Sequence, residues 1–112
     1  MNNYSELKQF LGSRSRKKLM NNTWAIDLGE DCVGIELYHT TILKFCSDDS
    51  IILNSGGWKT VTTKDRMNRY SNNFRVYQEK FVWYVHYFDI HYIYEDYMIL
   101  NPDGTVSYLD RR

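Results

Sequence analysis

Short apolar stretches with alternating polar positions run through the chain from Thr23 onward. They are rich in β-branched and aromatic residues and are separated by Gly, Asp, Asn and Pro, a pattern that predicts antiparallel strands joined by tight turns. The expected strands are residues 23–28, 32–38, 41–46, 50–54, 74–78, 81–87, 97–100 and 105–109. The expected turns lie at residues 29–31, 47–49, 79–80 and 101–104.

The N-terminal residues have a different pattern. Leu7, Phe10 and Leu11 are spaced three and four apart, which predicts a short helix with Ser5 as its N-cap and Gly12 at its end. Residues 13–22 are polar and basic without a clear period, so we expect a loop or a frayed helical turn there.

A second small helix is expected at about residues 63–71, after the fourth strand. Thr62 and Asp65 resemble a capping box, although Asp stands where Glu is more common. The predicted fold class is α+β, mainly β: an antiparallel β-meander of hairpins with a short N-terminal helix and one small helix. At 112 residues the chain suits a single domain, 1–112, with the helix and basic loop at 1–22 and the β-rich core at 23–109.

Charge is balanced overall but unevenly distributed. Residues 1–80 carry 12 basic and 9 acidic side chains, whereas residues 81–112 carry 2 basic and 5 acidic ones. Residues 8–18 contain five basic side chains and no acid, and residues 59–75 contain five basic side chains and one acid. The zero net charge argues against a strong general attraction to nucleic acid or to anionic membranes, so any attraction is local.

The sequence favours a cytoplasmic protein with no membrane span and no cofactor. No apolar run approaches the roughly 20 residues that a membrane helix needs, and the first residues lack a signal-peptide pattern. Cys32 and Cys46 lie in separate apolar stretches without metal-ligand spacing, so we expect two buried thiols.

The segment Gly56-Gly57-Trp58, followed by a threonine-rich helix start, has two interpretations. The backbone N–H groups and hydroxyls could bind a phosphate, with Lys59, Lys64, Arg66 and Arg69 as counter-charges. The alternative is structural: the glycines permit a sharp corner, Trp58 packs into the core and the threonines cap the helix.

The two basic segments, 8–18 and 59–75, are candidates for binding single-stranded nucleic acid, because basic and aromatic side chains are interleaved near the second. The residues in question are Arg14, Arg16, Lys17, Lys18, Trp58, Lys59, Lys64, Arg66 and Arg69.

The densest aromatic block lies between residues 84 and 97. Exposed tyrosines are preferred contact residues at protein interfaces, and neighbouring acids suggest a basic partner protein. The candidate partner-binding residues are Tyr84, Tyr92, Tyr94, Glu95, Asp96 and Tyr97.

We expect no catalytic or metal site. His86, Asp89 and His91 could meet only if a turn separates the histidines, because on one continuous strand the two would face opposite ways. His39 lies beside threonines, but no carboxylate is placed by the sequence to complete a catalytic triad.

The run LNSGGWKTVTTKDRMN (residues 53–68) resembles a signature of small proteins encoded by tailed bacteriophages, cyanophages among them. Phe10-Leu11-Gly12, the basic residues before Thr23, and the pattern Leu37-x-His39-x-Thr41 agree, so the resemblance spans about residues 9–78. It implies a phage origin and the cytoplasm of an infected bacterium, but no particular activity.

Two functions remain open after this resemblance. The first is a non-enzymatic accessory protein that docks on a host protein and could inhibit a defence or metabolic complex. The second is nucleic-acid binding through the basic segments. An exposed strand edge would also permit a homodimer.

Overall fold

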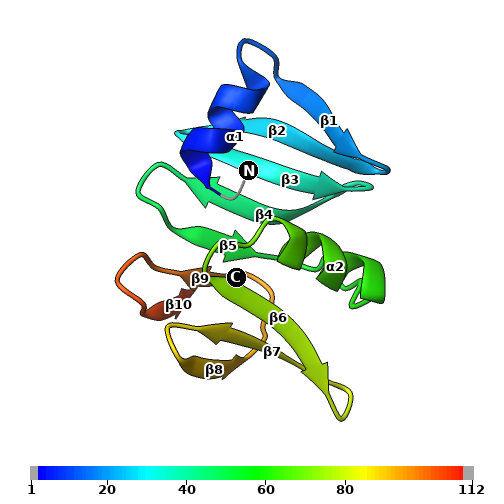
Figure 1. Ribbon diagram of the computed structural model, residues 1–112, viewed down its shortest axis with the longest axis vertical. Coiled ribbons are helices and arrows are strands. Elements are labelled where there is room, and N and C mark those ends of the chain that lie inside the picture. Colours follow the sequence, from blue (N-terminus) through cyan, green and yellow to red (C-terminus); the bar gives the residue numbers. More distant parts are fainter. Residues whose placement is uncertain (1–2, 110–112) are drawn as a thin grey trace.

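The computed structural model describes residues 3–109, which form two helices and two antiparallel sheets (Figure 1). This confirms the predicted α+β, mainly β class. In chain order the elements are α1 (Tyr4–Leu11), β1 (Arg16–Met20), β2 (Thr23–Gly29), β3 (Cys32–Leu37), β4 (Thr40–Cys46), β5 (Ile51–Leu53), α2 (Val61–Arg69), β6 (Phe74–Glu79), β7 (Val82–Tyr87), β8 (Ile90–Ile93), β9 (Met98–Leu100) and β10 (Val106–Tyr108).

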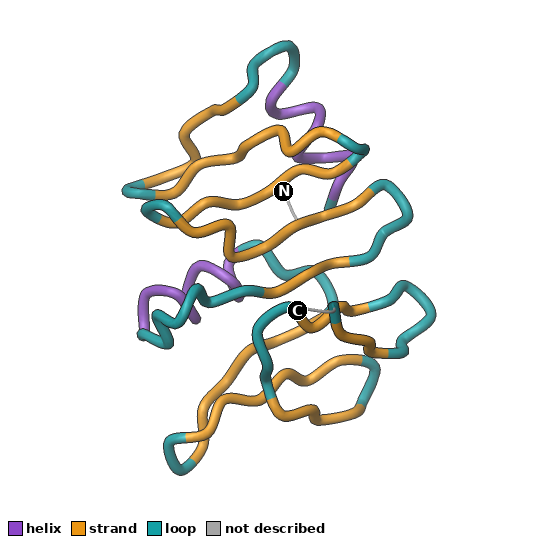
Figure 2. Tube along the Cα trace, turned by 180° about the vertical axis from the view of Figure 1, so that it is seen from behind, coloured by secondary structure: helices purple, strands orange, loops and turns teal. Residues whose placement is uncertain are grey.

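The larger sheet has seven strands in the order β1-β2-β3-β4-β5-β9-β10. Alternation places one set of side chains inward, and cross-strand neighbours such as Ala25 and Ile35 or Leu43 and Leu53 are all buried. Helix α1 contacts β2 and β3 and contributes Leu7 and Leu11 to the same core (Figure 1). Figure 2 shows the strands of this sheet from the opposite side.

The smaller sheet consists of β6, β7 and β8. Its inward residues include Val76, Trp83 and Val85, which belong to the same core cluster as Met67 of α2. Asn68 of α2 fixes the helix to this sheet, because its side chain donates to the carbonyl of Val76 and accepts from the N–H of Val76, both at 2.7 Å. One core therefore supports both sheets and both helices.

Two strands depart from the sequence prediction. The basic segment expected as a loop contains β1, where Lys18 pairs with Trp24 and the side chain of Leu19 packs on the core. Tertiary pairing overrides the lack of a period there. Strand β8 was not predicted because the turn before it, Phe88-Asp89, contains no Gly or Asn, although both residues adopt positive φ (49° and 62°).

The helix caps also differ from the prediction. Asn3, not Ser5, caps α1 by accepting the Glu6 N–H at 2.9 Å. Thr60, not Thr62, caps α2, so this helix starts and ends two residues earlier than the expected range of 63–71. Thr62 and Asp65 form no capping box, because Thr62 already lies within the first turn.

Candidate partner-binding surfaces

The loop between β5 and α2 makes a tight corner at Gly56. Its φ is +62°, and a Cβ at this position would lie 2.8 Å from the side chain of Thr40. The Asn54 side chain accepts the Gly56 N–H at 3.0 Å, and Ser55 Oγ accepts the Gly57 N–H at 3.2 Å. The glycine thus allows the loop to pack directly on β4, as the structural interpretation expected.

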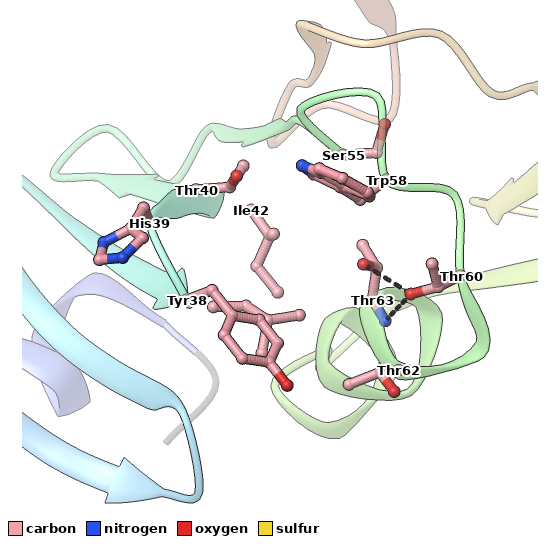
Figure 3. A pocket seen from close by; sticks show the side chains of 10 residues that line it. Tyr38, His39, Thr40, Ile42, Ser55, Trp58, Thr60, Thr62 and Thr63 are labelled. Atoms are coloured by element: carbon pink, nitrogen blue, oxygen red, sulfur yellow. Dashed lines mark hydrogen bonds between the residues drawn. The ribbon is translucent and has the colours of Figure 1, made fainter.

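This corner forms one wall of an open cavity of about 370 Å³, called here the Trp58 cavity. The opposite wall comes from the β3–β4 turn, and Figure 3 shows Tyr38 and Trp58 on either side of Ile42. The lining residues are Leu37, Tyr38, His39, Thr40, Ile42, Ser55, Trp58, Thr60, Thr62 and Thr63. None of these ten side chains carries a carboxylate, an ammonium or a guanidinium group.

Trp58 does not pack into the core, contrary to the structural interpretation of the segment. Its side chain is 68% exposed, and that of Tyr38 is 59% exposed. His39 lies in the same turn, also exposed (Figure 3). The sequence pointed to only one wall of this cavity, because residues 55–63 were candidates for a site but Tyr38 was not.

Behind the cavity, Asp96 organises a buried polar cluster. One carboxylate oxygen, Oδ1, accepts from Tyr94 Oη at 2.7 Å, Ser55 Oγ at 2.8 Å and Ser55 N–H at 2.9 Å. Burial opposes ionisation of Asp96, but these hydrogen bonds and nearby Lys59 leave its pKa below the ordinary value. Burial and the hydrogen bond to Asp96 together raise the pKa of Tyr94.

The outward side of the smaller sheet forms a second surface, called here the hairpin face. Across it Tyr77 pairs with Tyr84, which pairs with Ile93, while Arg75 pairs with His86, which pairs with His91. Its members are Arg75, Tyr77, Glu79, Val82, Tyr84, His86, His91 and Ile93.

Contacts between side chains organise this face. The rings of Tyr77 and Tyr84 stack with centroids 5.4 Å apart, and Tyr77 Oη lies 2.7 Å from Nδ1 of His91. Ile93 is 62% exposed beside them, and Phe81 in the adjoining turn is 94% exposed. The face therefore presents ordered aromatic and aliphatic groups to solvent.

The two histidines of the hairpin face meet because a turn separates them, which is the condition that the sequence left open. Their rings stack with centroids 4.3 Å apart and planes 7° apart. Within residues 3–109 no group of three or more His, Cys, Asp or Glu side chains is arranged to hold a metal ion.

The structure divides the predicted partner-binding residues among three places. Tyr84 lies on the hairpin face, whereas Tyr94 (3% exposed) and Asp96 belong to the buried polar cluster. Tyr92, Glu95 and Tyr97 lie outside both, Tyr92 half-buried against the core and the other two exposed. No single acidic aromatic surface results, and the only acid on the hairpin face is Glu79.

Much of the first basic segment is engaged within the chain. Arg16 Nη2 lies 3.0 Å from Glu36 Oε1, and its guanidinium stacks on Trp24. Lys17 Nζ donates to the carbonyl of Phe10 and lies over its ring. Arg14 and Lys18 are exposed. Lys8 pairs with Asp27 of β2 as Arg16 does with Glu36 of β3, and these pairs weaken the local positive field.

The second basic segment is engaged in a similar way. Arg66 donates to Thr23 Oγ1 at 3.0 Å and pairs with Asp65, which Arg69 also approaches at 3.6 Å. Lys64 Nζ lies over the Trp83 ring at 5.6 Å from its centroid, and Lys59 Nζ lies over the Tyr94 ring at the same distance.

Beside α2 is a shallow basic groove of about 410 Å³, called here the basic groove. It is lined by Val61, Lys64, Asp65, Asn68, Arg69 and Arg75. Val61 and Thr62 are neighbours in the first turn of α2, so that turn separates the basic groove from the Trp58 cavity.

The two cysteines lie directly opposite each other on β3 and β4. Cys32 is buried and Cys46 half-buried, both as free thiols. Burial, followed by the nearby Cys46, raises the pKa of Cys32 to about 11, so this thiol stays protonated at neutral pH.

Neither described helix has the length and apolar character to cross a membrane.

The fold and these surfaces define a small, mainly β protein with solvent-accessible aromatic side chains on two surfaces. A family model described as Kyanoviridae Gp96 protein matches residues 6–102, and the chain belongs to that family. The phage resemblance is thereby confirmed at family level, and the match continues beyond residue 78 through the Tyr-rich segment. Searches of curated proteins and of solved structures gave no match.

Proposed function

We propose that this phage-family protein is a non-enzymatic accessory protein that docks on a host protein through the hairpin face. The observation that carries the proposal is the row Tyr77, Tyr84 and Ile93, in which two stacked tyrosine rings and an exposed aliphatic side chain lie side by side on three strands. Tyrosine is enriched among residues that dominate binding energy.

The charge of the hairpin face favours an apolar contact. Arg75 and Glu79 balance each other, and the acids expected to attract a basic partner are elsewhere. Docking in the cytoplasm of the infected cell could block a host defence or metabolic complex by occupying its surface, which requires no active site on this chain.

Affinity capture from a host lysate tests this function. The binding variant combines Tyr84→Ala with Ile93→Ser, and the matched control combines Tyr108→Ala with Leu28→Ser, an exposed aromatic and an exposed aliphatic residue elsewhere. Wild type and control should recover the same host protein, and the binding variant about tenfold less or none. Undiminished recovery by the folded binding variant would contradict the proposal.

A second candidate function is nucleic-acid binding, favoured by the three basic side chains of the basic groove and by exposed Trp58. Gel shifts with single- and double-stranded DNA and RNA at two salt concentrations test it. This candidate predicts binding that weakens steeply with salt and that is reduced by Arg69→Ala. Absence of any shift at low salt would eliminate it.

A further inference from the structure

The Trp58 cavity has the features of a binding site that is separate from the hairpin face. Two exposed rings stand on its walls with Ile42 between them (Figure 3), and the buried side chains of Ile42 and Leu37 belong to its lining. Its volume of about 370 Å³ is within the usual range of ligand pockets, roughly 300–1,000 Å³. Exposed Trp and Tyr rings at such a place offer π faces for stacking or edge contacts.

The surface that lines the cavity is predominantly apolar, and three of its hydroxyl groups already form hydrogen bonds within the chain. Ser55 Oγ already donates to Asp96 and accepts from Gly57. Thr60 Oγ1 accepts the Thr63 N–H at 3.2 Å and shares a hydrogen bond with Thr63 Oγ1 at 3.1 Å (Figure 3). A ligand with many polar atoms would therefore lose more hydrogen bonds to water than this lining can replace.

The apolar character of the lining discriminates between a nucleobase and an aromatic side chain as the ligand. A nucleobase carries several donors and acceptors, more than this predominantly apolar lining can pair, whereas an aromatic side chain carries at most one polar group. The lining contains no Asp, Glu, Lys or Arg side chain to pair with an ionised ligand, which disfavours one. An aromatic side chain matches both the rings and the predominantly apolar lining.

Basic side chains near the cavity favour a ligand that carries negative charge beside its ring. Lys59 follows Trp58 directly and is exposed, and Lys64, Arg69 and Arg75 line the basic groove against Asp65 alone. The groove begins at Val61, at the first turn of the helix whose threonines line the cavity. A segment crossing this turn would place its neighbouring residues over basic side chains, which complements acidic residues.

We propose that the Trp58 cavity binds an aromatic side chain of a partner protein, in a segment whose flanking acidic residues lie over the basic groove. Tyr38 and Trp58 contact the partner's ring, Ile42 supports it from below, and the basic groove fixes the direction of the segment. Apart from Arg75, which belongs to both surfaces, this site lies outside the hairpin face, and it does not depend on the docking function proposed above.

Blocked synthetic peptides test the site without a host protein. The first probe is acetyl-Glu-Asp-Trp-Asp-Glu-amide, titrated into isotope-labelled protein while the amide resonances of Gly57 and Thr63 and the indole resonance of Trp58 are followed. These resonances should shift on binding. A peptide with Ala in place of Trp, and one with Lys in place of each acid, should each bind about tenfold more weakly.

Variants of the protein provide the matched controls. Trp58→Ala should abolish binding of the first peptide, Trp58→Phe should restore part of it, and Phe81→Ala, at an exposed aromatic residue of another turn, should leave it unchanged. Equal binding of the Trp and Ala peptides, or wild-type binding by Trp58→Ala, would overturn the aromatic site. Equal binding of the Lys-flanked peptide would overturn the assigned direction. Host capture by the hairpin face is a separate readout, so the two proposals fail separately.

Discussion

The hairpin face and the Trp58 cavity both expose aromatic side chains, but they are built in different ways. The hairpin face comes from one continuous segment, residues 74–93, and its side chains touch one another across neighbouring strands. The Trp58 cavity joins a turn at residues 38–40 to a loop at residues 55–63. A flat face with preformed stacking suits a broad contact, whereas a concave site suits a single inserted side chain.

The buried polar cluster connects the two regions, because Ser55 belongs to the cavity loop and Tyr94 follows β8 of the smaller sheet. Asp96→Ala should have the largest effect on stability, about 3 kcal/mol, since three donors would lose their acceptor in a partly buried site. Urea unfolding measures this loss. The control Asp103→Ala, at an exposed turn, should cost much less. Equal losses of unfolding free energy in Asp96→Ala and Asp103→Ala would show that the hydrogen bonds of Asp96 do not hold the cavity loop to the segment after β8.

The corner at Gly56 should affect the cavity more than the hairpin face. Gly56→Ala should destabilise the protein by about 2 kcal/mol, because it combines positive φ with a Cβ pressed against Thr40. Gly57→Ala also has positive φ but open space around its Cβ, so it should cost about 1 kcal/mol. The difference in unfolding free energy between the two variants is the measurement. A reversed order would contradict the packing of this loop on β4.

Lowering the pH should weaken the hydrogen bonds of Asp96, which connect the cavity loop to the segment after β8. Its pKa is lowered in the folded state, so its contribution is present above the unfolded value of about 3.9 and is lost as pH falls through the folded value. The stability difference between wild type and Asp96→Asn should therefore be constant from about pH 7 to pH 5 and shrink below about pH 4. Urea midpoints across this range measure the difference. A gap that stays constant at low pH would contradict an ionised Asp96.

The smallest stability effects are expected at exposed Trp58 and half-buried Tyr84. Trp58→Ala and Tyr84→Ala should each change the unfolding free energy by no more than about 1 kcal/mol, because neither side chain is fully buried. Thermal or urea unfolding checks this. A loss of several kcal/mol at either position would assign that ring to the core instead of to a recognition surface.

The comparison also shows what the sequence could predict. Alternation located eight of the ten strands to within one residue at each end, and a corner at Gly56-Gly57 was one of the two interpretations of that segment. Strand β8 was hidden because the turn before it has positive φ at Phe88, a bulky residue that seldom adopts this conformation. Strand β1 was hidden because basic residues such as Arg16 gain partners only when β2 and β3 are in place.

The sites were harder to predict than the strands. The density of tyrosines pointed to residues 84–97, but composition could not distinguish Tyr84, on the hairpin face, from Tyr94, whose hydroxyl is held by Asp96. Once β8 was missed, the inward and outward residues could not be assigned beyond residue 88. Tyr38 escaped notice because its role depends on a loop 20 residues further along the chain.

Hydroxyl-radical footprinting of the complex with the captured host protein tests the docking claim most directly, since it reports the solvent exposure of individual side chains. We expect Tyr77, Tyr84 and Ile93 to become protected in the complex while Tyr108 remains reactive. Unchanged reactivity of all three hairpin-face residues, with protection elsewhere on the molecule, would contradict the docking claim.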